Sequence, residues 1–407
     1  MDTTEKLLVS LDFGKRKIDI GELAISRAKI YFKYYSDFLS QGIEISPFKM
    51  SLSNTILSAD QEPFDGLFGV FSDSLPDGWG RLLLNRKLSS MGINLSSITP
   101  LDRLAYVGSK GLGALNYQPE ITSEKKSFIL ELDSISYETK QVLEGFDTNI
   151  LDRLYQLGGS SGGARPKIFV GFNPETEHII YDPGLIPEAY EHWIIKFASS
   201  NDPVDIANIE YAYYKMALDA GIEMNSCKLF KGESGRMYFG TKRFDRIGND
   251  RLHMHSASGL MHDNFRLSTM DYGHLMDCAF RLENHVAAYD KIFRLASFNV
   301  FAHNRDDHSK NLSFLMNNKG IWKLAPSYDL TFSYSSHGHH STMISGESKD
   351  PGTKHLMKLA EYFSVSTAKD YLEQVKNVVS KWKKYAADAG VNKDSQKRIE
   401  AVLQRIR

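Results

Sequence analysis

The segment from His303 to Asn311 carries the residue types whose spacing points most directly to chemistry. Within it, Asp306 precedes Asn311 by five positions. Phosphoryl transfer uses this spacing, because the aspartate accepts the proton of the attacking hydroxyl and the asparagine binds magnesium. Asp329 follows as a single acid in the otherwise apolar segment 325–330, where it is suited to hold the metal against phosphate groups. A base, an amide ligand and a second acid in this order predict a phosphotransferase.

The remaining polar residues of this segment allow a second interpretation. Lys310 is suited to neutralise charge on a transferred phosphoryl group. Asp307 and His308 are instead typical of a two-carboxylate metal hydrolase, with His303 as a further ligand. The two histidines are five positions apart, on different faces of a helix, and the His-rich run 337–340 is typical of an exposed loop. Phosphoryl transfer is therefore the favoured interpretation.

A glycine-rich segment, 158–167, contains four glycines in ten residues directly before a predicted strand. Glycine allows positive φ angles and lets backbone N–H groups approach an anion closely, as a phosphate-binding loop requires. The spacing matches neither the Walker pattern nor GxGxxG, so a flexible surface loop is the alternative. Ser160 and Ser161, inside this segment, are also candidates for phosphorylation.

Lys196 stands alone in the apolar strand predicted over 192–197. Because an unpaired buried ammonium is costly, it needs an anionic partner. Nucleotide phosphates and Glu210, near the start of a helix predicted over 206–220, are the candidates. The alternative is a lysine that reaches solvent at the end of the strand.

The segment 242–246 follows a predicted strand at the point where the hinge of a kinase meets adenine. The backbone from Lys242 to Phe244 has N–H and C=O groups to offer to the base. A solvated end of a strand is the alternative, since a charge cluster of this kind is only modestly specific.

Composition excludes several classes of protein. The chain is 42% hydrophobic and 24% charged, which is ordinary for a soluble globular protein, and its net charge of −1 gives no general reason to bind nucleic acid or a membrane surface. Cys227 and Cys278 are far apart and in no metal-ligand spacing. The N-terminus does not resemble a signal peptide, and no apolar run approaches the roughly 20 residues of a membrane span. We expect a soluble cytoplasmic protein.

Hydrophobic patterning divides the chain into three units, over 1–120, 146–245 and 246–407. The first mixes short strands with a few helices, and the third is mainly helical. The basic stretch after residue 368 is typical of a solvated helix face, with a surface for nucleic acid or an acidic partner as the alternative. The second unit has predicted strands over 166–171, 192–197, 227–230 and 238–244.

Six segments in this order resemble the signatures of the HipA family of serine/threonine protein kinases, the toxins of bacterial toxin–antitoxin modules. The resemblance covers nearly the whole chain, and the glycine-rich and catalytic loops are its most diagnostic parts. Neither DFG nor APE follows the segment 304–311, so the activation-loop logic of eukaryotic kinases does not transfer. The six segments are SDSLPDGWG (72–80), SSGGARPK (160–167), WIIKF (193–197), KRFDR (242–246), NRDDHSKN (304–311) and PSYD (326–329).

The resemblance implies an α+β fold of the atypical two-lobed protein-kinase-like type, with an additional β-rich N-terminal subdomain and a mainly helical C-terminal lobe. ATP and Mg²⁺ would lie between the lobes, with Asp306 as catalytic base, Lys310 as a catalytic cation, and Asn311 and Asp329 on the metal. Ser160, or Ser161 beside it, would be autophosphorylated, which ejects the loop and silences the kinase. The implied nucleotide contacts are Ser161, Gly162, Gly163, Ala164, Arg165, Lys167, Lys196, Lys242, Arg243, Phe244 and His308.

The resemblance also implies partners. One is a HipB-like helix-turn-helix antitoxin, which binds operator DNA and carries the toxin into the complex. The protein substrate can be an aminoacyl-tRNA synthetase, whose phosphorylation stalls translation. Two rivals stay open: a small-molecule kinase with the same Asp-to-Asn spacing, and a weakly active corepressor in an antitoxin–DNA complex.

Overall fold

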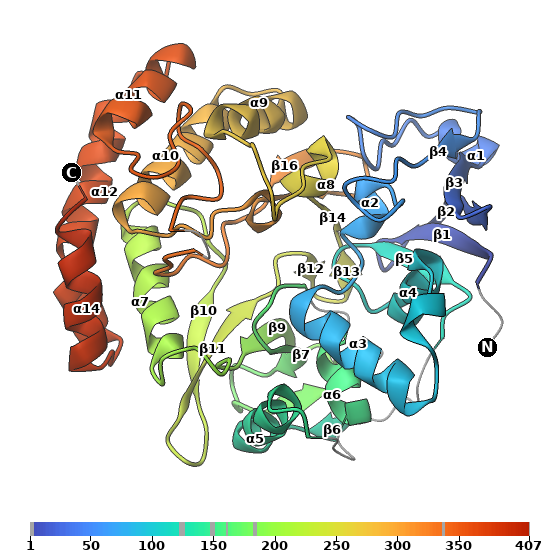
Figure 1. Ribbon diagram of the computed structural model, residues 1–407, viewed down its shortest axis with the longest axis horizontal. Coiled ribbons are helices and arrows are strands. Elements are labelled where there is room, and N and C mark those ends of the chain that lie inside the picture. The colour runs from blue at the N-terminus through green and yellow to red at the C-terminus, as the bar shows by residue number, and fades with distance from the viewer. Residues whose placement is uncertain are drawn as a thin grey trace.

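The computed structural model describes residues 4–121, 127–146, 151–159, 162–181, 185–335 and 338–406. It begins with a five-stranded antiparallel sheet in the order β4-β3-β2-β1-β5, at the right of Figure 1. Ile30, Phe32 and Tyr34 alternate along β3 and are buried, so one face of this sheet lies on a core. The strands are β1 (Lys6–Asp12), β2 (Lys17–Ser26), β3 (Lys29–Tyr34), β4 (Leu57–Ser58) and β5 (Leu115–Gln118).

Helices fill the connection between these strands. The Thr99 side chain accepts from the Asp102 N–H, and the Asp102 carboxylate accepts from the Thr99 N–H, which caps α4 with Pro100 in its first turn. The helix α3 leaves the N-terminal sheet and packs beside α6 (Figure 1). The N-terminal subdomain therefore shares a core with the next part of the chain. The helices are α1 (Ser36–Leu39), α2 (Gly69–Ser72), α3 (Gly78–Ser90), α4 (Pro100–Val107) and α6 (Leu151–Gly158), with a 3-10 turn, Leu95–Ser97.

A six-stranded antiparallel sheet follows, in the order β10-β11-β9-β7-β8-β6. Its register pairs Lys167, at the start of β7, directly with Lys196, at the end of β9. The two side chains therefore point to the same face of the sheet. The strands are β6 (Phe128–Ile129), β7 (Lys167–Phe172), β8 (Ile179–Tyr181), β9 (Glu191–Lys196), β10 (Cys227–Lys231) and β11 (Met237–Lys242), with helices α5 (Leu132–Leu143) and α7 (Ile206–Asp219).

The C-terminal part is mainly helical. Two short sheets, β12–β13 and β14–β15–β16, precede and interrupt its helices, and α12 and α13 pack against α7, with α7 and α12 at the left of Figure 1. The strands are β12 (Arg246–Ile247), β13 (Asp250–Arg251), β14 (His253–Ser256), β15 (Ser313–Met316) and β16 (Trp322–Leu324). The helices are α8 (Ala257–Met261), α9 (Tyr272–Glu283), α10 (Ala287–Phe301), α11 (Thr353–Tyr362), α12 (Ala368–Ser380), α13 (Trp382–Asp388) and α14 (Lys393–Leu403), with a 3-10 turn, Ser309–Asn311.

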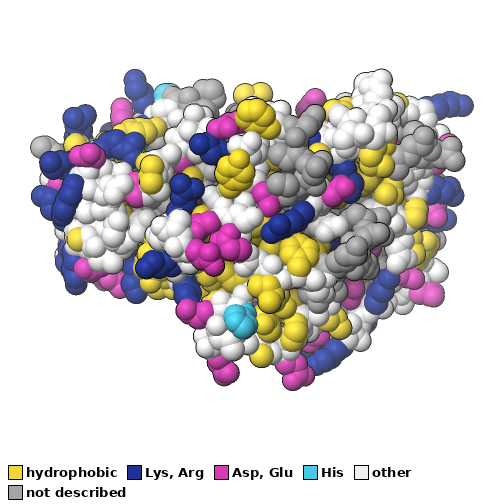
Figure 2. All heavy atoms as spheres, turned by 90° about the horizontal axis from the view of Figure 1, so that it is seen from below, with side chains coloured by type: hydrophobic (Ala, Val, Ile, Leu, Met, Phe, Trp, Pro, Cys, Tyr) yellow, Lys and Arg dark blue, Asp and Glu magenta, His cyan; other side chains and the backbone are white. Residues whose placement is uncertain are grey.

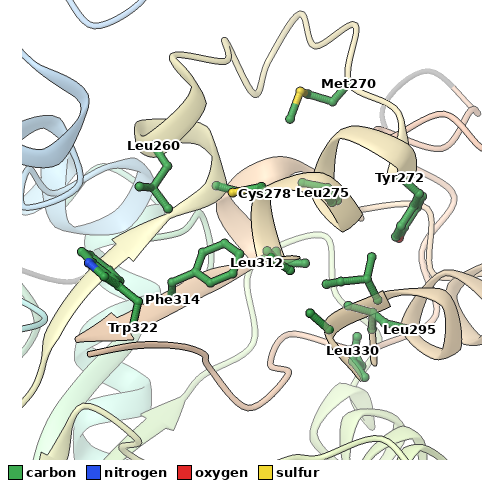
Figure 3. Close-up of a cluster of buried hydrophobic side chains, with 14 of the residues drawn as sticks. Leu260, Met270, Tyr272, Leu275, Cys278, Leu295, Leu312, Phe314, Trp322 and Leu330 are labelled. Atoms are coloured by element: carbon green, nitrogen blue, oxygen red, sulfur yellow. The ribbon is translucent and has the colours of Figure 1, made fainter. Parts of the chain in front are cut away.

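A cluster of buried side chains supports the loops that carry the predicted site (Figure 3). Leu312 directly follows Asn311, Leu330 directly follows Asp329, and both leucines belong to this cluster and are buried. The two predicted metal ligands are therefore anchored by their immediate neighbours. On the face shown in Figure 2, acidic and basic side chains are interspersed. None of the described helices is both long and apolar enough to cross a membrane.

Candidate active site

All described residues that the sequence predicted for the site line one cleft of about 1180 Å³. The cleft lies between the six-stranded sheet and the C-terminal loops, and the N-terminal subdomain closes it with Asp73, Asp77 and Gly78. Ser160 and Ser161 lie outside the described residues. The predicted residues in the cleft are Gly162, Gly163, Ala164, Arg165, Lys167, Lys196, Lys242, Arg243, Phe244, Asp306, His308, Lys310, Asn311 and Asp329.

Lys196 is buried and lies between two carboxylates. Its Nζ atom is 2.8 Å from Glu210 Oε2, and it also donates to Asp329 Oδ1. The pairing predicted between the strand lysine and Glu210 is thus present. Burial alone would lower the pKa of Lys196, but Asp329 and Glu210 outweigh it and raise that pKa above its ordinary value. The ammonium therefore stays charged beneath the glycine-rich loop.

Arg165 ties the glycine-rich loop to α7. Its Nη1 atom is 2.7 Å from Glu210 Oε1, and its Nη2 atom is 3.0 Å from Asp202 Oδ1. Asp202 in turn accepts from the Ser199 N–H at 2.9 Å. The guanidinium is thus held by two protein carboxylates, and its predicted contact with a nucleotide stays a prediction.

Lys167 is the cross-strand neighbour of Lys196 and, unlike Lys196, is not paired with a carboxylate of the described residues. Its ammonium makes no hydrogen bond or ion pair with any residue that the structure describes. Burial lowers its pKa, although Asp329 and Asp77 oppose that effect from a distance. Gly163, with φ +85°, leaves room for it, since a Cβ atom there would lie 2.6 Å from Lys167 Nζ. Two adjacent lysines with one of them unpaired form a site for an additional anion.

The catalytic loop places its two adjacent aspartates in opposite environments. The Asp306 side chain is 57% exposed, and its nearest charged partner is His308 Nε2 at 3.7 Å from Oδ1. Asp307 is buried and pairs with His340 Nδ1 at 2.9 Å, and its other oxygen accepts from the Ser341 N–H at 2.8 Å. Asp306 is therefore accessible to an incoming hydroxyl, whereas Asp307 holds the loop together.

The other predicted residues of this loop also face the cleft. The Asn311 side-chain N–H donates to the Asp306 carbonyl at 2.8 Å, which leaves its amide oxygen free for a ligand. The His308 ring lies against Phe265, with ring centroids 5.2 Å apart. Its Nδ1 atom is buried and has no partner among the described residues.

Asp329 follows β16 in a left-handed backbone conformation, with φ +55°, which an aspartate tolerates better than most residues. Burial would raise its pKa, but Lys196 and Lys167 outweigh it and hold the pKa below its ordinary value. One carboxylate oxygen binds Lys196, which leaves the second available. One free carboxylate oxygen and the Asn311 amide oxygen fit a hard cation that completes its shell with phosphate and water.

The described residues contain no group of three or more His, Cys, Asp and Glu side chains arranged to hold a metal by themselves.

The hinge differs from the expectation at two of its three residues. The Lys242 N–H donates to the Ser226 carbonyl at 2.9 Å, and the Arg243 N–H donates to the His192 carbonyl at 2.8 Å. Both groups are used because the chain is still paired as a sheet there. Of these three residues, only Phe244 has an N–H group without an acceptor among the described residues. It is therefore the one N–H group of the hinge that could bind an adenine base.

The Arg243 side chain is also unavailable to a ligand. It is buried and binds Asp245 through both Nε at 2.9 Å and Nη2 at 2.7 Å. The Phe244 ring lies 5.4 Å from the ring of Tyr328, centroid to centroid. An apolar wall beside one free N–H group suits a flat base.

Sequence reasoning missed two acids of the N-terminal subdomain. Asp77 binds Lys310 Nζ at 2.8 Å, across 233 positions of sequence. Asp73 lies 2.6 Å from His255 Nδ1, and His255 Nε2 lies 3.0 Å from Ser46 Oγ. This Asp–His–Ser chain is not a hydrolase triad, because Ser46 is 1% exposed and does not line the cleft. Both acids lie inside the segment 72–80, which was the available signal for them, but its resemblance carried no role for either residue.

Two family models match the chain. The model described as HipA N-terminal domain matches residues 14–118. The model described as HipA-like C-terminal domain matches residues 159–382, which is more than half of the chain. Comparison with curated proteins finds no match.

Among solved structures, HipA from the toxin–antitoxin system of Shewanella oneidensis MR-1, solved with HipB and operator DNA, is similar with a TM-score of 0.66 and 17% identity. That match covers 98% of this chain and 97% of the other. The Helicobacter pylori proinflammatory kinase CtkA matches with a TM-score of 0.33 and 12% identity, over 53% of this chain and 90% of the other. The first likeness confirms the predicted α+β, kinase-like fold.

Proposed function

The chain belongs to the HipA family, and from that premise we propose that it is an ATP- and Mg²⁺-dependent serine/threonine protein kinase, the toxin of a toxin–antitoxin pair. The observation that carries this proposal is the lysine pair of the cleft. Lys196 is neutralised by Glu210 and Asp329, while Lys167 directly opposite forms no ion pair with any of the described residues. A phosphate chain supplies the missing negative charge, and the accessible Asp306 lies in the same cleft.

The proposed reaction is an in-line transfer. The bond between the γ-phosphorus and the oxygen bridging it to ADP breaks, and a bond from the γ-phosphorus to the acceptor hydroxyl oxygen forms. Asp306 takes the hydroxyl proton, and ADP leaves with the bridging oxygen. Lys167 and Lys310 stabilise charge on the phosphoryl oxygens, and Lys196 keeps Asp329 and Glu210 in place.

Asn311 and Asp329 would hold the magnesium ion, which neutralises charge on the phosphates when it is bound. Lys196 occupies one Asp329 oxygen and so orients the other. The side-chain N–H of Asn311 is engaged with the Asp306 carbonyl, which turns its amide oxygen away from that bond. The two ligands are thus oriented by contacts of the chain itself.

The exposure of Asp306 favours a macromolecular acceptor over a small alcohol. The acid is 57% exposed, and Arg266 and Leu267, which also line the cleft, are exposed next to Phe265. An open mouth admits a serine or threonine on a protein loop. We infer that the substrate is a protein of the translation machinery, such as an aminoacyl-tRNA synthetase. Phosphoproteomics of cells producing wild-type protein or Asp306→Asn would reveal it, and sites that rise equally with both proteins would contradict this inference.

We also infer regulation of the kinase by its own loop and by a HipB-like antitoxin that carries it to operator DNA. Autophosphorylation of Ser160 or Ser161 would add a phosphate to the glycine-rich loop, eject the loop and silence the kinase. Mass spectrometry of the active protein should find phosphate on one of these serines, and phosphate on other residues alone would argue against the loop switch. Operator binding only after the antitoxin is added would support the partner.

Transfer of label from γ-³²P-ATP tests the proposed function. Wild-type protein with Mg²⁺ should label protein acceptors on serine or threonine, and excess EDTA should stop the transfer. Lys196→Met should lose the transfer, whereas Lys215→Met, a substitution on the same stretch of chain outside the cleft, should keep it. If wild-type protein neither binds ATP nor transfers label to any protein, the proposal is wrong. Label found only on small alcohols would identify a small-molecule kinase instead.

A further inference from the structure

Asp77 directly precedes α3, at the N-cap position, but its side chain does not cap the helix. An aspartate at this position usually accepts a hydrogen bond from an N–H group of the first helical turn, which stabilises the helix by about 1 kcal/mol. Here the side chain makes no such bond. Its carboxylate points into the cleft instead, where Oδ2 lies 2.8 Å from Lys310 Nζ and Oδ1 accepts from the Gly163 N–H. The cleft, and not the helix, fixes its position.

The two donors that Asp77 occupies are those expected to bind a terminal phosphate. One is a backbone N–H group of the glycine-rich loop, and the other is the lysine of the catalytic loop. The Asp77 and Lys310 side chains are each only 16% exposed. Burial would raise the pKa of Asp77, but Lys310 outweighs it together with the Gly163 N–H, so the pKa is held below its ordinary value. The acid is therefore a fixed anion between two phosphate-binding groups.

The neighbours of Asp77 hold the glycine-rich loop against it. The Trp79 N–H donates to the Gly163 carbonyl at 3.1 Å. Gly78 has φ +43°, and a Cβ atom there would lie 2.6 Å from Ala164 Cα, so only glycine allows this close approach. Three consecutive residues of the N-terminal subdomain, 77–79, thus contact Gly163 and Ala164 of the glycine-rich loop.

We propose that Asp77 is an internal placeholder for the γ-phosphate. This inference rests on the proposed function. Without a triphosphate, the Asp77 carboxylate holds Lys310 and the Gly163 N–H in their binding positions. The γ-phosphate of ATP then takes over both donors and displaces the carboxylate, because two anions do not share one pair of donors without strong repulsion. ADP has no γ-phosphate and leaves the bridge in place. Asp77 acts as a positioning residue: ATP has to compete with its carboxylate for the two donors, whereas ADP does not.

Isothermal titration of ATP and ADP, each with Mg²⁺, tests the placeholder in wild-type protein and Asp77→Asn. Asparagine keeps the shape and can still accept from the Gly163 N–H, but it presents no charge to Lys310. Because the ATP γ-phosphate no longer competes with a charged Asp77 carboxylate for Lys310, the variant should bind ATP about tenfold more tightly, whereas its ADP affinity should stay within about twofold of wild type. A double-mutant cycle in a Lys310→Met background should abolish the gain, because the contested donor is then absent.

The outcomes separate the two proposals. If wild-type protein binds ATP and Asp77→Asn changes the ATP and ADP affinities by the same factor, or weakens ATP binding, the placeholder is wrong while nucleotide binding stands. If wild-type protein does not bind ATP at all, the proposed function fails. Urea unfolding of the variant checks that it is folded, and asparagine is itself a good residue for the start of a helix.

Discussion

Asp306→Asn separates catalysis from stability more cleanly than any other change in the cleft. The acid is 57% exposed, and its carboxylate accepts no hydrogen bond from the described residues; His308 at 3.7 Å is its nearest charged neighbour. An exposed change without partners shifts the free energy of unfolding by no more than about 0.5 kcal/mol. Asparagine has nearly the same shape, so ATP binding should also stay within about twofold of wild type.

The expected loss is confined to the chemical step. Removing a general base lowers the rate about 10²–10⁴-fold. At about 1.36 kcal/mol for each factor of ten, this corresponds to about 2.7–5.4 kcal/mol of transition-state stabilisation. The assay is single-turnover transfer from γ-³²P-ATP at saturating nucleotide, with the ATP affinity and the urea unfolding curve measured on the same preparation.

Asp307→Asn is the matched control, one residue further along the same loop. Asp307 accepts from the Tyr272 hydroxyl at 3.0 Å and pairs with His340 through the same oxygen, Oδ2. An amide nitrogen in that position cannot accept from either, and a buried group without its partner costs about 1–3 kcal/mol of stability. If Asp306→Asn keeps more than a tenth of the wild-type rate, Asp306 is not the base. If Asp307→Asn loses transfer with its stability unchanged, the roles of the two acids are reversed.

Three further predictions follow from the same geometry. Gly163→Ala should weaken ATP binding about tenfold, because its Cβ atom would lie 2.6 Å from Lys167 Nζ and must push the ammonium aside. Gly235→Ala is the control: with the same φ of +85° and open space around it, it should lower the stability by a similar amount and leave the ATP affinity unchanged when both variants are titrated with ATP. Burial lowers the pKa of His253 to about 3, so below about pH 6.5 the unfolded state binds more protons than the folded state, and the free energy of unfolding decreases as the pH falls. In urea unfolding, His253→Gln should reduce the stability lost between pH 6.5 and pH 5 by about 2 kcal/mol. Asp329→Asn should raise the Mg²⁺ concentration for half-maximal transfer at least about tenfold in a magnesium titration, and an unchanged value would remove Asp329 as a ligand.

Local contacts of the site could be predicted from the sequence, whereas distant ones could not. Lys196 and Glu210 are only 14 positions apart, on a strand and the helix that follows it, so their order alone suggested the pair. Asp77 and Lys310 are 233 positions apart, and a turn-forming Pro-Asp-Gly gives no sign of a partner at that distance. The strand β2 was also missed, because Asp19 and Glu22 lower its β propensity and only pairing with β1 and β3 overrides them.

The hinge shows a second limit of sequence reasoning. The pattern at 242–246 located the hinge in the cleft, but which backbone groups remain free depends on where the sheet ends. Pairing between β9 and β11 continues to Lys242, and the Arg243 N–H still donates to the His192 carbonyl. Hydrogen bonds of this kind depend on register, which a single sequence specifies only weakly at the end of a strand.

The N-terminal subdomain is part of the catalytic unit and not an appendage to it. Asp73 accepts from the backbone N–H and the hydroxyl of Ser256, both at 2.7 Å. The Gly113 N–H donates to the buried Asp245 at 2.7 Å, directly behind the hinge. Asp77 binds Lys310 of the catalytic loop. The subdomain therefore contacts three parts of one cleft, namely the hinge, β14 at Ser256 and the catalytic loop, and a carboxylate takes part in each contact. Because a buried carboxylate requires its partners, each of these contacts is costly to break, and Asp77, which contacts both Gly163 and Lys310, makes the alignment of the glycine-rich loop with the catalytic loop depend on the first 120 residues.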